Sequence, residues 1–143
     1  MKIKIICVGK PKEKAITMLE NELLKRTKIE ISETKDSNIN KEGEKIIELL
    51  DKTENKFIFI LSEEGKQFSS VELSQKLQKI SLEGKQILFI IGGPYGLSDA
   101  VKKKADIVLS LSKMTFTHEM ARLFLIEQIY RAVSIIENKK YHK

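Results

Sequence analysis

Cysteine, proline and glycine are scarce in this sequence: its 143 residues include one cysteine, two prolines and seven glycines. The single thiol, Cys7, cannot form an intrachain disulfide, which excludes a disulfide-stabilised secreted domain. So little proline and glycine excludes collagen-like chains and flexible linkers. We therefore expect one compact domain that spans residues 1–143.

Long apolar runs are also missing. Nowhere do 18 uncharged apolar residues follow one another, and the apolar stretch at the start is too short for a signal peptide. We therefore expect a cytoplasmic protein that makes no membrane contact.

The two histidines, His118 and His142, lie far in sequence from each other and from Cys7. Metal-ligand spacing is thus absent, and no bound metal is expected.

Standard nucleotide-binding signatures are missing as well. The first apolar run ends in Gly9-Lys-Pro-Lys, which has one glycine where a dinucleotide fingerprint needs three. Gly65-Lys66 lacks the earlier glycine and the hydroxyl residue of a phosphate-binding P-loop.

Positive charge, by contrast, is in excess: 26 lysines and arginines against 20 acidic residues give a net charge of +6. This excess favours a polyanionic partner such as nucleic acid, although many basic proteins bind none.

Apolar runs at 3–8, 57–61, 87–91 and 107–109 predict β-strands. The second and third are apolar at every position, which is typical of central strands in a parallel sheet covered on both faces. Residues 28–34 alternate between apolar and polar, which predicts an edge strand. Helical patterns occur at 11–26, at 41–51, from 69 onward, at 101–104 and at 118–138. The predicted fold is α/β, with a mainly parallel sheet and helices on both faces.

Local signals place two of the helix starts. Pro11 suits a first helical position, and Ser69 has capping-box spacing to an acidic residue three positions later. The first helix is expected to bury a stripe made by Ile16, Leu19 and Leu23.

The last expected helix carries two apolar stripes, one from Leu123 to Val133 and the other from Leu125 to Ile136. A helix that is apolar over so much of its surface must be covered from two directions. We expect a second copy of the chain to supply one of these covers. The alternative is a helix buried wholly within its own domain.

Two segments are candidates for a ligand site. Gly-Gly-Pro-Tyr-Gly at 92–96 follows a central strand, at the sheet edge where α/β proteins bind ligands, and its glycines let a ligand lie against the backbone. Leu-Ser-Leu-Ser-Lys-Met-Thr-Phe-Thr-His at 109–118 mixes hydroxyls with apolar side chains, which suits a pocket wall for a heterocycle. The alternatives are a tight turn without a ligand, and a loop folded on the core with Thr117 capping the helix.

These segments resemble the ribosomal RNA large subunit methyltransferase H family. The likeness extends to Leu-Ser-Glu-Glu-Gly-Lys at 61–66, to Arg-Leu-Phe-Leu-Ile-Glu-Gln-Ile-Tyr-Arg-Ala at 122–132 and to the terminal Tyr-His-Lys, and so covers essentially the whole chain. One departure is Thr117, where relatives often carry proline. A threonine there can still cap the helix.

The resemblance implies a SPOUT-class fold with a C-terminal trefoil knot, which works as a homodimer. It implies methyl transfer from S-adenosylmethionine to N3 of a pseudouridine in 23S ribosomal RNA of the large subunit. The cofactor contacts that it implies are Leu61, Gly92, Leu111, Ser112, Lys113, Met114, Thr115 and Phe116. Because the chain is short and has no separate RNA-binding domain, we expect a shaped, preassembled substrate such as the assembled ribosome.

Three residues near the end of the sequence are candidates for catalysis. Our hypothesis is that Arg131, Tyr141 and His142 serve the RNA base, with His142 as general base or orienting group. The alternatives are a frayed tail and a surface pair between Arg131 and Glu127.

For the whole chain, the alternatives are a non-catalytic RNA-binding or ribosome-binding protein of the same fold, and a transfer RNA methyltransferase of the same class.

Overall fold

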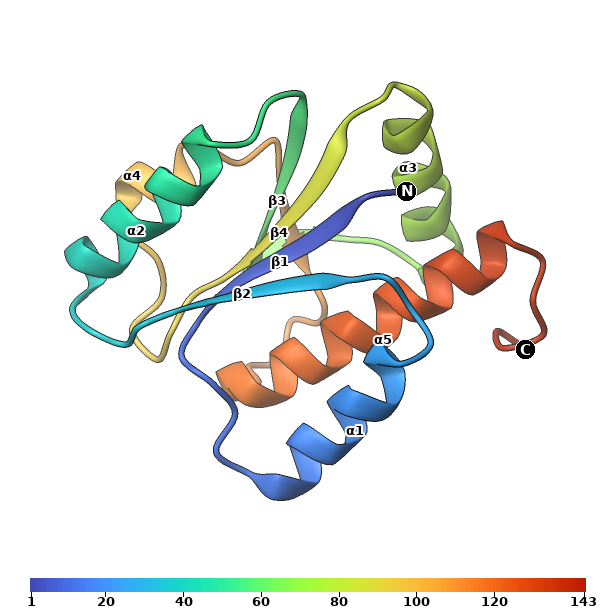
Figure 1. Cartoon of the computed structure of the whole chain (residues 1–143), viewed down its shortest axis with the longest axis horizontal. Coiled ribbons are helices and arrows are strands. Elements are labelled where there is room, and N and C mark those ends of the chain that lie inside the picture. Colours follow the sequence, from blue (N-terminus) through green and yellow to red (C-terminus); the bar gives the residue numbers. More distant parts are fainter.

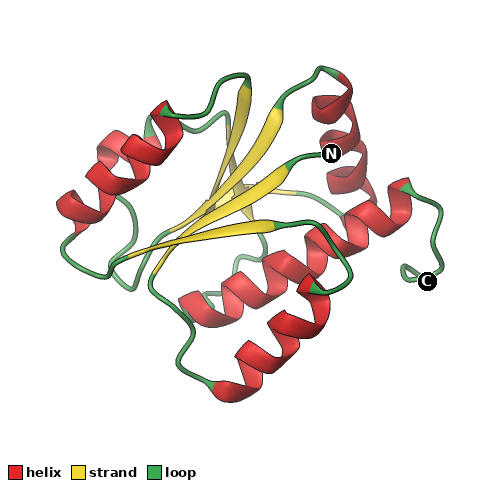
Figure 2. Cartoon of the chain, in the orientation of Figure 1, coloured by secondary structure: helices red, strands yellow, loops and turns green.

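Five parallel strands form one sheet in the computed structural model, which describes all 143 residues. The strand order is β2-β1-β4-β3-β5, and helices lie on both faces of the sheet (Figures 1 and 2). The strands are β1 (Ile3–Val8), β2 (Glu30–Thr34), β3 (Lys56–Gln67), β4 (Gln86–Ile91) and β5 (Ile107–Ser110). The helices are α1 (Lys14–Leu24), α2 (Ile39–Asp51), α3 (Ser70–Leu82), α4 (Asp99–Lys102) and α5 (His118–Ile136).

The sheet separates two hydrophobic clusters. On one face α1, α3 and α5 cover a cluster that includes Phe59 and Phe89, whose rings stack with centroids 4.8 Å apart. On the other face α2 and α4 cover a smaller cluster around Ile58 and Leu88. Adjacent residues of β3 and β4 thus point into different clusters, which explains why these two strands are apolar at successive positions. The α/β prediction with helices on both faces is confirmed, whereas the knot implied by the resemblance stays a prediction.

The central and edge positions of the strands are as predicted, but β3 is longer than its apolar run. It continues from Leu61 to Gln67 and pairs with β5 on both sides of an irregularity in register, because Leu61 and Lys66 both lie opposite Leu109. Gly65 lies in this second half of β3. The extension has no apolar alternation, so the sequence pattern could not reveal it.

The capping box at the start of α3 is confirmed, since Ser69 and Glu72 cap each other's backbone. The predicted start of the first helix is wrong. Pro11 precedes α1, which begins at Lys14 after a connection that lacks a side-chain cap of its own. The predicted apolar stripe is also wrong at one position, because Leu19 is 55% exposed and the buried residue of α1 is Glu20.

Most of the α5 surface is covered within the chain, by α1 and α3. Leu125, Ile126, Ile129 and Ala132 are fully buried, and only Phe124 is an exposed large apolar side chain of this helix. The structure therefore supports the alternative of burial within one chain for most of both stripes. None of the helices has the length and apolar composition needed to cross a membrane.

Candidate active site

A cavity of about 890 Å³ opens beside the middle of β3 and the ends of β4 and β5. Its walls come from residues 60–64 of β3, the end of β4, the turn after β4 and the loop that leads into α5. The lining residues are Ile60, Leu61, Ser62, Glu63, Glu64, Ile91, Gly92, Gly93, Pro94, Gly96, Leu97, Lys102, Val108, Leu111, Ser112, Met114, Thr115, Phe116, Thr117, His118, Glu119 and Ala121. The volume is near the upper end of the range typical of small-molecule sites.

The turn after β4 is tight because Gly92 and Gly96 approach each other closely. A Cβ atom on Gly92 would lie 2.8 Å from the backbone carbon and oxygen of Gly96. Gly96 has φ +84°, in the left-handed region that favours glycine, and its N–H donates to the Gly93 carbonyl at 3.0 Å. The turn therefore needs glycine for its own geometry, and it also forms one wall of the cavity. The alternative of a tight turn is thus confirmed, and a ligand at this wall stays a prediction.

The loop that leads into α5 forms a second wall and is held by its own hydroxyl groups. Ser110 Oγ donates to the Ser112 carbonyl at 2.9 Å, and Ser112 Oγ accepts from the Met114 N–H at 3.0 Å. Thr117 caps α5 by accepting from the Met120 N–H at 3.2 Å. The expected helix cap is thus confirmed. It coexists with the wall, whose Met114 side chain is 75% exposed.

Charged groups line the cavity unevenly. Glu63, Glu64 and Glu119 contribute three carboxylates, against one lysine, Lys102. Thr115 Oγ1 donates to the Glu63 carboxylate, which ties the loop before α5 to the extension of β3. A cavity with apolar walls and an excess of carboxylates suits a ligand that combines a flat heterocycle with positive charge.

Glu119 joins the start of α5 to the connection between β1 and α1. Its Oε1 accepts from the backbone N–H of Lys12 at 2.5 Å and of Glu13 at 3.2 Å. These hydrogen bonds, from Glu13 and then Lys12, lower the pKa of the Glu119 carboxyl. Glu119 thereby fixes the connection just before α1, whose N-cap residue Glu13 makes no side-chain cap.

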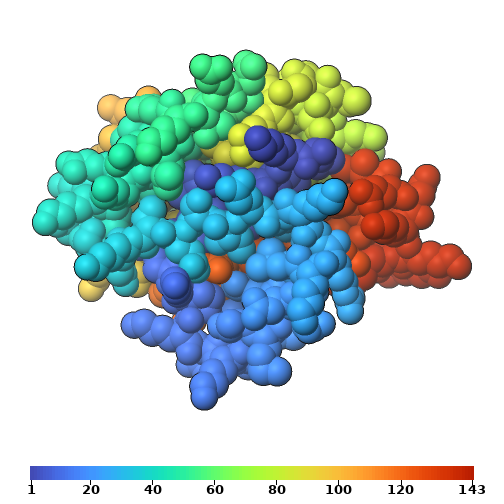
Figure 3. Space-filling model, in the orientation of Figure 1, coloured from blue at the N-terminus to red at the C-terminus, as the bar shows by residue number.

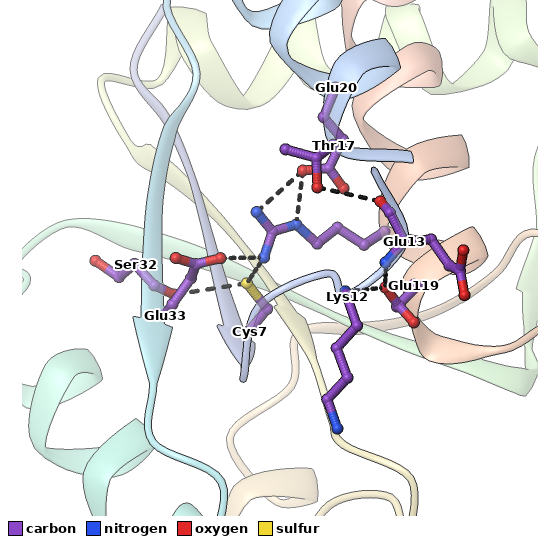
Figure 4. Close-up of polar contacts among 9 residues, drawn as sticks. Cys7, Lys12, Glu13, Thr17, Glu20, Ser32, Glu33 and Glu119 are labelled. Atoms are coloured by element: carbon purple, nitrogen blue, oxygen red, sulfur yellow. Dashed lines mark hydrogen bonds and ion pairs between the residues drawn. The ribbon is translucent and has the colours of Figure 1, made fainter. Parts of the chain in front are cut away.

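Arg122, one turn further along α5, is buried in a polar cluster that joins four elements (Figure 4). Its Nη1 donates to Glu33 Oε2 of β2 at 2.6 Å and to the Cys7 sulfur of β1 at 3.2 Å. Its Nε and Nη2 lie 3.1 and 3.0 Å from Glu20 Oε1 of α1. Glu20 Oε2 is buried without a hydrogen-bond partner.

Burial raises the pKa of two of the three groups that contact Arg122. It raises the pKa of the Cys7 thiol to about 11, so this thiol stays protonated and unreactive at neutral pH. Burial also raises the pKa of Glu20, while the nearby Arg122 guanidinium opposes that shift. Sequence reasoning missed this cluster. The available signal was an arginine and a glutamate inside otherwise apolar helical stripes.

All the residues implied as cofactor contacts line the cavity except Lys113, whose side chain lies outside it. The three candidates for catalysis do not line the cavity. They lie together at the other end of α5, about 20 Å along the helix axis from His118 at 1.5 Å rise per residue. The structure therefore gathers the predicted residues into two separate groups, and their roles stay predictions.

The tail group is ordered by its own contacts. Arg131 donates to Glu127 Oε1 through Nε at 3.0 Å and Nη2 at 2.5 Å, and Tyr141 donates to the same oxygen at 3.0 Å. Arg131 Nη1 lies 3.2 Å from His142 Nδ1. Burial, and next the hydrogen bond to Glu127, raises the pKa of Tyr141. In the space-filling view the C-terminal residues project at the periphery of the molecule (Figure 3).

Comparison with known proteins shows extensive similarity. A family model described as "Predicted SPOUT methyltransferase" matches residues 1–142. Ribosomal RNA large subunit methyltransferase H of Acholeplasma laidlawii is 45% identical over an alignment that covers all of both chains. The proteins of the same name from Christiangramia forsetii and Malacoplasma penetrans are each 42% identical, with coverage of 99% and 100% of both chains.

Solved structures are similar in fold at low sequence identity. A putative RNA methyltransferase from Bacillus anthracis aligns with a TM-score of 0.58 and 15% identity, covering 91% of this chain and 93% of that one. The SpoU methyltransferase AviRb from Streptomyces viridochromogenes, in complex with AdoMet, aligns with a TM-score of 0.51 and 10% identity, covering 97% of this chain and 59% of that one. These two likenesses concern the fold alone.

Proposed function

The chain belongs to the SPOUT methyltransferase family and, within it, to the ribosomal RNA large subunit methyltransferase H group, and from this premise we propose that it methylates N3 of a pseudouridine in 23S ribosomal RNA. The methyl donor in this proposal is S-adenosylmethionine, which supplies a methyl group on a positively charged sulfur. The observation that carries the proposal is the cavity between the turn at 92–96 and the loop at 111–116.

The lining of the cavity fits this donor. Leu61, Leu97 and Leu111 offer apolar surface to an adenine ring, and the backbone of the glycine turn lies open on one wall. The carboxylates of Glu63 and Glu64 favour the positive charges of the sulfonium and ammonium groups. The fit thus rests on shape and on charge. Leu61 and Leu111 are among the contacts that the resemblance implies, whereas Leu97, Glu63 and Glu64 are known only from the lining of the cavity.

The tail group has the chemistry that the RNA base requires. N3 of the base carries a proton at neutral pH, so catalysis must stabilise the anion that remains when this proton leaves. Arg131 can only donate hydrogen bonds, so His142 Nδ1 is the acceptor in this pair, which leaves Nε2 as the ring nitrogen that can donate. In the proposal the N3 proton passes to solvent, His142 orients the base by donating from Nε2, and Arg131 stabilises the negative charge left on a base oxygen. Tyr141, with its raised pKa, stays protonated and acts as a donor.

Because one chain keeps the tail group far from the cavity, we infer that a second copy brings them together. In this homodimer the cavity of one subunit would face Arg131, Tyr141 and His142 of the other subunit. Both groups are well formed in the single chain, so each can serve as half of a composite site.

A mixing experiment tests this arrangement. Gly92→Ala impairs the cavity, because the added Cβ meets the Gly96 backbone, and His142→Ala impairs only the tail. Each variant alone should lose methylation of 70S ribosomes, by about 10²-fold or more for His142→Ala. Mixed and allowed to exchange subunits, they should recover about a quarter of the wild-type rate, because each mixed dimer has one intact site. A mixture as inactive as its components would show that the tail serves its own chain.

Binding and product identity test the proposed function itself. Calorimetric titration with S-adenosylmethionine should give binding to the wild type and to His142→Ala alike, and weaker binding to Gly92→Ala. Mass spectrometry of nucleosides from treated ribosomes should identify N3-methylpseudouridine in 23S RNA. Binding without transfer would favour a non-catalytic RNA-binding protein, and methylation of transfer RNA alone would favour that class of enzyme.

A further inference from the structure

We propose that the connection between β1 and α1, residues 9–13, is an RNA-docking arm whose Lys10 and Lys12 side chains contact phosphates of the substrate RNA. This inference rests on the proposed function, since it names the surface that receives the RNA. The occupant is the sugar-phosphate backbone near the target base. The argument combines the position of the arm, the contacts that fix it and its charge.

The arm lies beside the cavity. A small crevice is bounded by Gly9, Lys10 and Pro11 on one side, and by Gly92 and His118 on the other. Gly92 and His118 also line the main cavity. The arm is therefore the neighbour of both the glycine turn and the start of α5, so an RNA backbone that delivers a base to the cavity passes within its reach.

The arm is fixed by contacts at both ends. Gly9 has φ +75°, and its N–H donates to the Thr34 carbonyl at 2.8 Å, which anchors the arm to β2. At the other end Glu119 accepts from the N–H groups of Lys12 and Glu13. A segment with both ends hydrogen-bonded loses less conformational freedom when it binds, which favours affinity.

The contacts of the arm leave its lysine side chains free. Lys10, Lys12 and Lys14 are exposed, and none of the ion pairs in the structure involves them. Figure 4 shows the Lys12 side chain extending away from the buried Arg122 cluster. Cations without partners on a fixed backbone are suited to phosphate contacts.

Charge is divided between the cavity and its surroundings. Carboxylates predominate in the cavity, whereas the arm on one side and Lys102 on the cavity wall provide exposed positive charge. Such a division draws phosphate toward the lysines and keeps it out of the cavity, which suits a positively charged methyl donor. The arm thereby complements the RNA without competing with the cofactor.

The test removes two lysine charges from the arm, at the carboxyl ends of the strands. As a matched control, a second variant loses two lysine charges near the amino ends of the strands. Lys10→Ala/Lys12→Ala should raise the KM for 70S ribosomes about tenfold and leave the Kd for S-adenosylmethionine unchanged. The slope of log binding constant against log salt concentration should become less steep by about 1.5, because two phosphate contacts are lost. Lys2→Ala/Lys79→Ala, which removes two exposed lysines without ion pairs just before β1 and in the last turn of α3, should behave as the wild type in all three measurements.

A double variant with the wild-type KM and salt slope would overturn the proposal. An equal effect of the control variant would also overturn it, since only the net charge of the protein would then matter. The salt slope is obtained from binding to ribosomes in the absence of methyl transfer. It therefore tests the RNA contact even if the enzyme methylates a different nucleotide from the one proposed. Absence of methylation by the wild type would contradict the proposed function instead.

Discussion

Replacing Arg122 with leucine should lower the free energy of unfolding by about 3 to 5 kcal/mol, because it leaves buried charge without its partner. Glu20 and Glu33 both bind this guanidinium, and the Arg122 side chain is only 10% exposed. The free energy of unfolding is measured by urea denaturation at pH 7 for variant and wild type.

The dependence on pH distinguishes uncompensated charge from lost packing. Burial already raises the pKa of Glu20, and loss of Arg122 should raise it further. A folded state with a raised carboxyl pKa binds more protons than the unfolded state, so stability increases as pH falls through that raised pKa. The deficit of Arg122→Leu should therefore be smaller at pH 5 than at pH 7.

Glu20→Gln is the matched control for Arg122→Leu, because it keeps an oxygen that can accept from Arg122 and removes a desolvated charge. It should lose less stability than Arg122→Leu. A deficit for Arg122→Leu that is below about 1 kcal/mol, or that is the same at both pH values, would contradict the assignment of this cluster as a buried ion pair.

Replacing Gly65 with alanine should destabilise the chain by about 4 kcal/mol or more, since it places an atom inside the backbone of a neighbouring strand. The added Cβ would lie 2.5 Å from the Val108 carbonyl oxygen and 2.8 Å from the Leu109 carbonyl carbon. These atoms belong to β5, so β3 and β5 would have to separate. Thermal denaturation would show the loss, and calorimetry would show weakened binding of S-adenosylmethionine because Leu61 lies in β3 and Leu111 directly follows β5.

Gly84→Ala is the control for this substitution. A Cβ on Gly84 would meet nothing within 4 Å, but its φ of +78° imposes backbone strain of about 1 to 2 kcal/mol on any other residue. Gly65→Ala should therefore unfold at a clearly lower temperature than Gly84→Ala. Equal midpoints of thermal unfolding for the two variants would contradict the close approach of β3 and β5 at Gly65.

The parts of the fold that the sequence predicted well are those set by local pattern. The unbroken apolar runs at 57–61 and 87–91 mark central strands because each face of the sheet has its own helical cover. The capping box at Ser69 depends on residues three apart, so it is visible without the fold. The two walls of the cavity were found for the same reason, as glycine-rich and hydroxyl-rich segments that follow strands.

The parts that the sequence did not predict depend on contacts between distant residues. The buried residue of α1 is Glu20 and not Leu19, because Glu20 pairs with Arg122 of α5, which is distant in sequence. The start of α1 lies past Pro11, and Glu119 of α5 holds the backbone of Lys12 and Glu13 in between. Arg122 and Glu119 both lie in α5, so the pattern of α1 alone could not reveal them. The periodicity of α1 therefore assigned its buried positions and its start from hydrophobicity alone.

The strand order has a consequence for how the chain acquires its structure. β4 lies between β1 and β3, yet it follows both in sequence. During synthesis three of the five strands therefore precede the strand that joins β1 to β3, and both clusters stay incomplete at least until β4 arrives. Pairings between remote segments pay the entropy of closing long loops first, which makes refolding slow. A nascent chain of this kind depends on protection from aggregation until β4 has left the exit tunnel.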